Sequence, residues 1–177
     1  MNDRQAFEDR VLPHLDAAYN LARWLLRSEQ NAEDAVQDAV IRALRYGHAL
    51  RDGDAKPWLL GIVRNTCFTL LERARNGPDL LEFDDEAFQS QIQQAAPAEH
   101  GNPEDVLQRQ RTRVRVDSAI RALSPALREV IVLREFEDLA YDDMARIIGI
   151  PIGTVMSRLS RARDKLRQAL SVDPQGQ

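Results

Sequence analysis

A helical stretch near the end of the chain combines an apolar stripe with polar and cationic faces. The stripe, with spacings of 4, 3 and 4 residues, runs through Val155, Leu159, Ala162 and Leu166. The other faces carry hydroxyl, guanidinium, ammonium and thioether groups, at Thr154, Met156, Ser157, Arg158, Ser160, Arg161 and Lys165. Such polar groups can bond to phosphates and base edges. The pattern therefore predicts a helix that can lie in the major groove of DNA.

A shorter segment just before this stretch has the features of a supporting helix. Its apolar residues follow helical spacing, at Leu139, Met144, Ile147 and Ile148. Gly149 follows them, and glycine tolerates the left-handed turn that often ends a helix. Together the two segments predict a helix-turn-helix. The alternative is a helical hairpin that packs on its own domain and exposes its arginines to solvent.

The net charge of −4 hides a gradient along the 177 residues. Residues 1–76 hold 11 basic and 11 acidic side chains. Residues 77–107 hold eight acids and no Lys or Arg, whereas residues 108–177 hold 13 bases and nine acids. The basic excess thus lies on the piece with the predicted reading helix, where phosphate contacts would need it.

Residue types that carry out catalysis or bind metals are sparse. Cys67 is the single cysteine, and the three histidines are scattered at His14, His48 and His100. No metal site, Gly-rich phosphate loop or nucleophile–base set stands out, so we expect no cofactor and no enzyme. No apolar run of about 18 residues and no signal-peptide pattern occurs. These features predict a cytoplasmic protein that does not insert into membranes.

Apolar periodicity predicts an all-α fold. The first 76 residues predict a helix over 3–27, a second that is capped by Asn31–Asp34 and ends near Gly47, and a third from Trp58 to about Arg75. Acidic and polar residues then predict a flexible linker over 77–106.

Helical periodicity returns after the linker, and Ser124-Pro125 predicts a further helix start. The expected architecture is two small helical domains, 1–76 and 107–177, joined by the acidic linker. The second domain should be a four-helix helix-turn-helix.

Several motifs in order along the chain resemble one family. Residues 124–166 contain Ser124-Pro-x-Leu-Arg-Glu-Val, then Leu139-x-Tyr-Asp-Asp-Met-Ala, then Gly153-Thr-Val-x-Ser-Arg-Leu. This set is similar to the −35-reading domain of bacterial extracytoplasmic-function (ECF) RNA polymerase sigma factors. Upstream, Ala32-Glu-Asp-x-x-Gln-Asp resembles their polymerase-clamp segment, and Trp58-Leu-x-x-Ile-x-Arg-Asn resembles their promoter-opening segment.

The resemblance implies an alternative sigma factor that joins core RNA polymerase and directs promoter-specific transcription. Asp34, Gln37 and Asp38 would bind the polymerase clamp; the alternative is a solvated acidic face. The expected partners are core RNA polymerase, promoter DNA and an anti-sigma factor. The acidic linker would pass through a basic polymerase channel, or would simply be a tether.

The −10 element would be bound by polar, cationic and apolar groups of the N-terminal domain, at Leu50, Arg51, Lys56, Trp58, Arg64 and Asn65. Trp58 could stack on an extruded base or could belong to the core. This chain lacks the aromatic residues that often precede the tryptophan in related factors. It also has Met156 where Lys or Arg is frequent, and the methionine could contact a thymine methyl group.

Two other function classes are compatible with parts of the sequence. A sigma-like decoy would bind an anti-sigma factor without driving transcription, and the thin aromatic content near Trp58 would suit it. A stand-alone helix-turn-helix regulator would not need the motif at 34–38. Transcription with purified core polymerase would distinguish these hypotheses.

Overall fold

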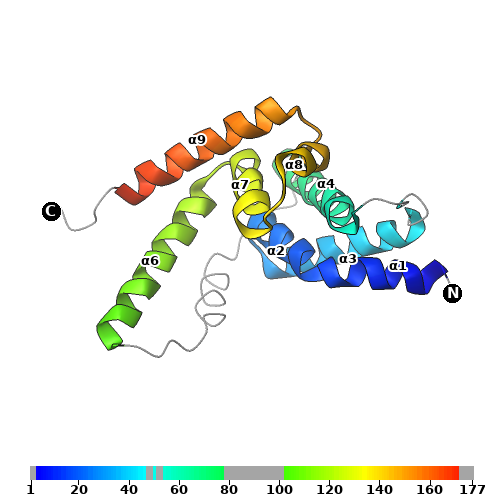
Figure 1. The fold of residues 1–177 in the computed structure, drawn as a ribbon, viewed down its shortest axis with the longest axis horizontal. Helices are drawn as coiled ribbons and strands as arrows, with labels where there is room; N and C mark the ends of the chain where they lie inside the picture. Colours follow the sequence, from blue (N-terminus) through cyan, green and yellow to red (C-terminus); the bar gives the residue numbers. More distant parts are fainter. Residues whose placement is uncertain (1–2, 47–49, 51–53, 78–101, 172–177) are drawn as a thin grey trace.

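The described part of the chain is helical. A computed structural model describes residues 3–46, 50, 54–77 and 102–171, and these residues contain no β-strand (Figure 1). None of the helices in these ranges is long and apolar enough to cross a membrane.

The N-terminal helix predicted over 3–27 is divided. The structure has α1 (Asp3–Val11), a 3-10 turn η1 (Leu12–His14) and α2 (Leu15–Leu26). Pro13 lies within the turn, and proline lacks the N–H that a continuous α-helix would use. The single-helix prediction is therefore wrong at this point, and the proline is the physical reason.

The second helix starts earlier than expected, as α3 (Glu29–Tyr46). The Ser28 hydroxyl oxygen accepts a hydrogen bond of 3.3 Å from the backbone N–H of Asn31. A serine in this position satisfies one of the unpaired donors of the first turn. The cap predicted at Asn31–Asp34 is thus wrong by one turn.

The third helix, α4 (Ala55–Asn76), completes the N-terminal domain. The Asp54 carboxylate caps it by accepting a 3.1 Å hydrogen bond from the backbone N–H of Lys56. Helices α2, α3 and α4 pack on one another. The packed face of α3 consists of small side chains that are almost fully buried, namely Ala32, Ala35, Ala39 and Ala43.

The C-terminal domain comprises α6 (Pro103–Ala122), α7 (Pro125–Ile131), the π-helical turn η3 (Val132–Phe136), α8 (Tyr141–Ile148) and α9 (Ile152–Ser171). Helix α6 begins inside the range predicted as linker; residues 78–101 of that range lie outside the described part. Leu139, expected within a helix, is buried just before α8. The predicted glycine turn is confirmed, because Gly149 has φ +76° and its N–H donates to the Ala145 carbonyl at 2.8 Å.

The two domains are in contact. Helix α4 lies against α8, and α2 lies against α7 and η3; in Figure 1, α7 and α8 lie beside the N-terminal helices, whereas α6 extends away from them. The buried apolar side chains of both domains form one continuous cluster. The two helical domains that the sequence predicts are therefore also in direct contact through apolar side chains.

Arg128 links the domains through backbone carbonyl groups. Its guanidinium donates at 3.0 Å to the carbonyl of Trp24, near the end of α2, and at 2.7 Å to that of Leu123, just after α6. The last carbonyls of a helix have no partner within the helix. A cation there also complements the negative end of the helix dipole. One buried side chain thus closes the ends of two helices from different domains.

Gly149 provides a test of the turn between α8 and α9. Changing Gly149→Ala should lower the free energy of unfolding by about 1 kcal/mol, because an alanine is strained at positive φ. A methyl group there would meet no atom within 4 Å beyond its own residue and the two neighbours in the chain, so the loss would come from the backbone conformation. Urea unfolding followed by circular dichroism measures the effect.

Gly153→Ala is the matched control. Gly153 is also exposed and also has open space at the added methyl position, but it lies within α9 and its φ is not positive. This substitution within α9 should leave stability unchanged or raise it by about 0.5 kcal/mol. Equal losses for both variants would contradict the assignment.

Candidate nucleic-acid interface

The exposed side of α9 carries most of the predicted −35 residues. Val155, Leu159 and Ala162 are buried against the domain, which aims the other faces outward. Met156 is 53% exposed, and three more of the predicted −35 residues are exposed, namely Ser160, Arg161 and Lys165. These four side chains can reach a groove without rearrangement of the helix.

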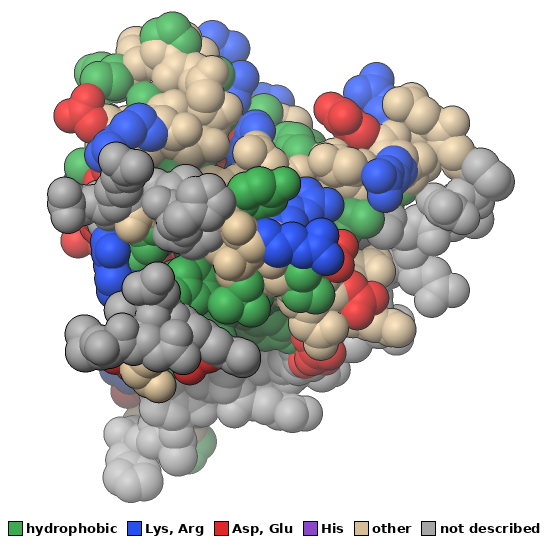
Figure 2. Space-filling view, turned by 90° about the vertical axis from the view of Figure 1, so that its right-hand side faces the viewer, with side chains coloured by type: hydrophobic (Ala, Val, Ile, Leu, Met, Phe, Trp, Pro, Cys, Tyr) green, Lys and Arg blue, Asp and Glu red, His purple; other side chains and the backbone are tan. Residues whose placement is uncertain are grey.

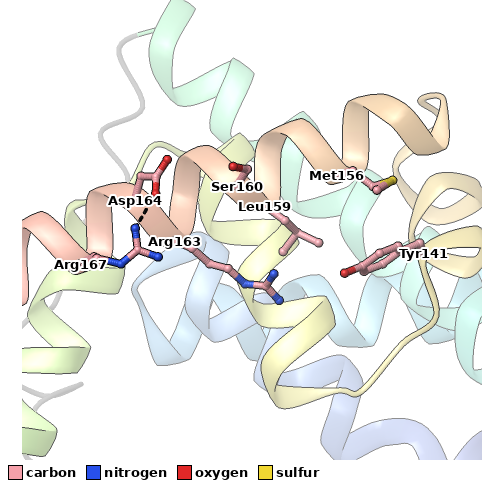
Figure 3. A pocket seen from close by; sticks show the side chains of 7 residues that line it. All are labelled: Tyr141, Met156, Leu159, Ser160, Arg163, Asp164 and Arg167. Atoms are coloured by element: carbon pink, nitrogen blue, oxygen red, sulfur yellow. Dashed lines mark hydrogen bonds and ion pairs between the residues drawn. The ribbon is translucent and has the colours of Figure 1, made fainter.

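A shallow pocket of about 220 Å³ lies along one flank of this surface. Figure 3 shows Met156 and Tyr141 at one end of it and Arg167 at the other, where Arg167 pairs with Asp164 at 2.7 Å. Arg163 lies between them and pairs with Glu135 at 2.7 Å. Tyr141, which is not among the predicted −35 residues, thus places a phenol beside the methionine, at the start of α8.

Three of the predicted −35 residues are less available. The Ser157 hydroxyl donates to the Thr154 carbonyl at 3.0 Å within the helix, and both residues are only partly exposed. Arg158 lies on the flank opposite Met156 and pairs with Glu129 at 3.4 Å. Glu129 is fully buried. Arg158 therefore joins α9 to α7 in this structure.

The predicted −10 residues of α4 do not form one exposed surface. Trp58 is partly buried and its ring packs edge-on against Phe7, with centroids 6.3 Å apart. Leu50 is buried, and its carbonyl accepts a 3.2 Å bond from Arg10. Asn65 is exposed, and Arg51 lies outside the described residues.

Both described cations of the −10 set bind carboxylates of the C-terminal domain. Arg64 contacts Glu129 through two bonds, Nε–Oε2 at 2.8 Å and Nη2–Oε1 at 3.2 Å. Its guanidinium also lies over the Phe68 ring, 4.0 Å from the centroid. The Lys56 ammonium lies 3.2 Å from the Glu137 carboxylate and donates to the Glu137 carbonyl at 2.9 Å.

Burial raises the pKa of Glu129, and this effect is opposed by the hydrogen bond from Arg64 and by the charges of Arg64 and Arg158. A carboxylate that is shielded from water stays ionised only where nearby cations and hydrogen-bond donors compensate for its lost hydration. Glu129 thus sits between two cations, one from each predicted DNA-binding surface.

The predicted polymerase residues share the outer face of α3. Asp34, Gln37 and Asp38 are all exposed, and Ile41, one turn further along, is 48% exposed. Figure 2, which looks onto the side where α1 and the end of α3 lie, shows hydrophobic and charged side chains intermixed. Ile41 is not among the predicted polymerase residues, although its position outside the buried alanine stripe of α3 indicates an exposed apolar side chain.

No group of three or more His, Cys, Asp or Glu side chains that could hold a metal occurs within the described ranges. Cys67 is fully buried. Burial raises the pKa of its thiol to about 12. The thiolate is the reactive form of cysteine, and a buried thiol with this pKa stays protonated at neutral pH. Cys67 is therefore an unreactive side chain of the core.

Comparisons with known proteins match the two domains separately. Residues 11–77 match the family model "Sigma-70 region 2", and residues 113–166 match "Sigma-70, region 4". The chain is 34% identical over 172 residues to the RNA polymerase sigma-H factor of Pseudomonas aeruginosa, covering 95% of this chain and 88% of that protein. It is 36% identical over 168 residues to the ECF RNA polymerase sigma-E factor of Escherichia coli K12, covering 93% and 86%.

The solved structures agree with this assignment. The fold is similar to that of the sigma factor RpoE in its complex with the anti-sigma factor NepR from Bartonella quintana, with a TM-score of 0.69, 29% identity, and coverage of 96% of this chain and 99% of that one. The helical fold, with sigma-70 region 2 followed by region 4, defines this chain as a sigma-70-type protein. The chain belongs to the family of ECF RNA polymerase sigma factors.

The chain spans 62% of the ECF RNA polymerase sigma factor SigE of Mycolicibacterium smegmatis, to which it is 30% identical over 166 residues.

Cys67 gives a direct test of the packing of α4. The native chain should not react with a thiol reagent such as iodoacetamide at pH 8, because the thiol is buried and almost fully protonated. Mass spectrometry should find one alkylated cysteine only after denaturation. Rapid labelling of the folded chain would contradict the buried position.

Proposed function

We propose that this chain is an alternative sigma factor that joins core RNA polymerase and directs promoter-specific initiation, with no catalytic role of its own. The observation that carries the proposal is the presence of two separate exposed faces on one chain, those of α9 and α3, together with a third set of polar residues on α4. A stand-alone DNA reader would need only the first.

We assign −35 reading to the exposed part of α9. Arg161 can donate two bonds to a guanine edge, and Ser160 can bond to a base or a phosphate. Met156 and Tyr141 offer an apolar contact for a thymine methyl group, whereas Lys165 suits a phosphate. We do not assign base reading to Arg158, because its ion pair with Glu129 fixes α9 against α7.

We assign −10 binding to Arg64, Asn65 and Lys56, with Trp58 close by. Opening a duplex requires bases to leave the stack and to be held by stacking, edge hydrogen bonds and phosphate contacts. The exposed amide of Asn65 suits a base edge, and the two cations suit the backbone. Leu50 supports this site through its packing.

The outer face of α3 is proposed to bind core RNA polymerase. Its acidic side chains flank the exposed Ile41, and a charged rim around an apolar centre is typical of protein interfaces. An anti-sigma factor is proposed as the second protein partner, because the similar solved structure is a complex with one.

Charge reversal on α3 tests the polymerase contact. Asp38→Arg should weaken binding to core polymerase at least about tenfold and reduce run-off transcription, because it places a cation where a basic partner is expected. Asp16→Arg, an equal change at an exposed acid of α2, should have little effect. Anisotropy of a labelled chain titrated with core enzyme measures the affinity.

The outcome of transcription itself decides between the function classes. Promoter-dependent run-off RNA from purified core enzyme plus this chain supports the sigma-factor function. Tight binding of an anti-sigma factor without initiation at any genomic promoter would favour the decoy. Specific binding of promoter DNA by the chain alone would favour a stand-alone regulator.

The two kinds of contact on α9 should respond differently to mutation. Arg161→Ala should relax the preference for one −35 base by about 1–3 kcal/mol, because a bidentate base contact is lost. Lys165→Ala should weaken holoenzyme binding to all −35 sequences alike and reduce the salt dependence by about one unit of slope. Equal losses on every sequence from Arg161→Ala would contradict its base-reading role.

A further inference from the structure

We propose that the C-terminal domain inhibits the N-terminal domain by presenting two carboxylates where DNA phosphates would bind. Glu129 and Glu137 are these carboxylates, and Arg64 and Lys56 are the cations they hold. The inference rests on the proposed −10 role of α4. It names the chain's own C-terminal domain as the partner that this surface binds before DNA does.

The geometry at Arg64 resembles a phosphate contact. Two N–H groups of the guanidinium bond to the two oxygens of Glu129, at 2.8 and 3.2 Å. This paired arrangement is the one that arginine forms with carboxylates and phosphates alike. The Arg64 side chain is only 17% exposed in this state. One guanidinium cannot hold Glu129 and a DNA phosphate with the same donors.

The geometry at Lys56 repeats the arrangement eight residues earlier on α4. The ammonium lies against the carboxylate and the carbonyl of Glu137, at 3.2 and 2.9 Å. Glu137 also accepts a 2.8 Å bond from Asn20 of α2, so its carboxylate contacts two helices of the N-terminal domain. Its side chain is 8% exposed. Both contacts therefore occupy the two cations, Arg64 and Lys56, that are proposed to bind the −10 element.

Opening this contact leaves the C-terminal domain intact. Glu129 retains Arg158 as a partner from its own domain, so its charge is not left unpaired when Arg64 departs. The packing of α4 on α8, the shared apolar cluster and the bond from Arg128 to the Trp24 carbonyl add to the closed state. The closed form is therefore the stable form of the free chain. It can open when core polymerase binds the two domains at separate positions.

Glu137→Ala is the first test, because this change removes two interdomain contacts and touches neither α9 nor Glu129. In the free, full-length chain it should raise the radius of gyration measured by X-ray scattering. It should also strengthen binding to a labelled 20-nucleotide single-stranded DNA about threefold to tenfold at low salt. Glu129→Gln should act in the same direction.

Glu135→Ala is the matched control. Glu135 lies in the same turn, but its partner is Arg163 of its own domain, so neither the radius nor the affinity should change. Arg64→Gln combined with Glu137→Ala should keep the larger radius and lose most of the gain in DNA affinity.

An unchanged radius and affinity for folded Glu137→Ala would overturn the inference, whatever Glu129→Gln does. The radius of gyration reports closure without any DNA, so it separates this inference from the proposed function. Holoenzyme made with Glu137→Ala should still initiate transcription. Absence of initiation by the unaltered chain would instead count against the sigma-factor function.

Discussion

A buried carboxylate, that of Glu129, determines how the helices of this chain meet. An ion pair at the surface contributes little to stability. A fully buried carboxylate, in contrast, must be matched by cations and hydrogen bonds, and removing one partner is costly. Arg64 of α4 and Arg158 of α9 supply the match. Three helices, α4, α7 and α9, are therefore fixed around one pair of oxygen atoms.

The neighbouring residue extends this role of α7. Arg128 donates to carbonyls at the ends of α2 and α6, while Glu129 receives the side chains of α4 and α9. Adjacent positions on a helix point in different directions, so a seven-residue helix contacts four others through two charged residues. Buried polar groups whose donors and acceptors are all paired specify a single arrangement of the helices. A continuous apolar cluster alone would allow several arrangements.

Local chemistry explains how much of the structure the sequence predicts. Periodicity locates the helices, and Gly149 and Ser124-Pro125 mark their ends because their effects act within one turn. The errors at Pro13 and Ser28 are also local, and closer attention to these two residues would remove them. The partner of Arg64 lies 65 residues away, and no pattern distinguishes an arginine that faces DNA from one that faces a carboxylate. The placement of Arg158 escapes prediction for the same reason.

These contacts also change how the acidic composition should be interpreted. The net charge of −4 includes the carboxylates of Glu129, Glu135 and Glu137, which would repel DNA. Each of them, however, is paired with a cation inside the molecule. If the domains separate, Glu129 and Glu135 keep partners in their own domain, whereas Arg64 and Lys56 become available. The potential on the N-terminal surface then becomes more positive although the total charge is unchanged. Phosphate binding depends on that local potential, so an acidic chain can still provide a cationic surface to a promoter.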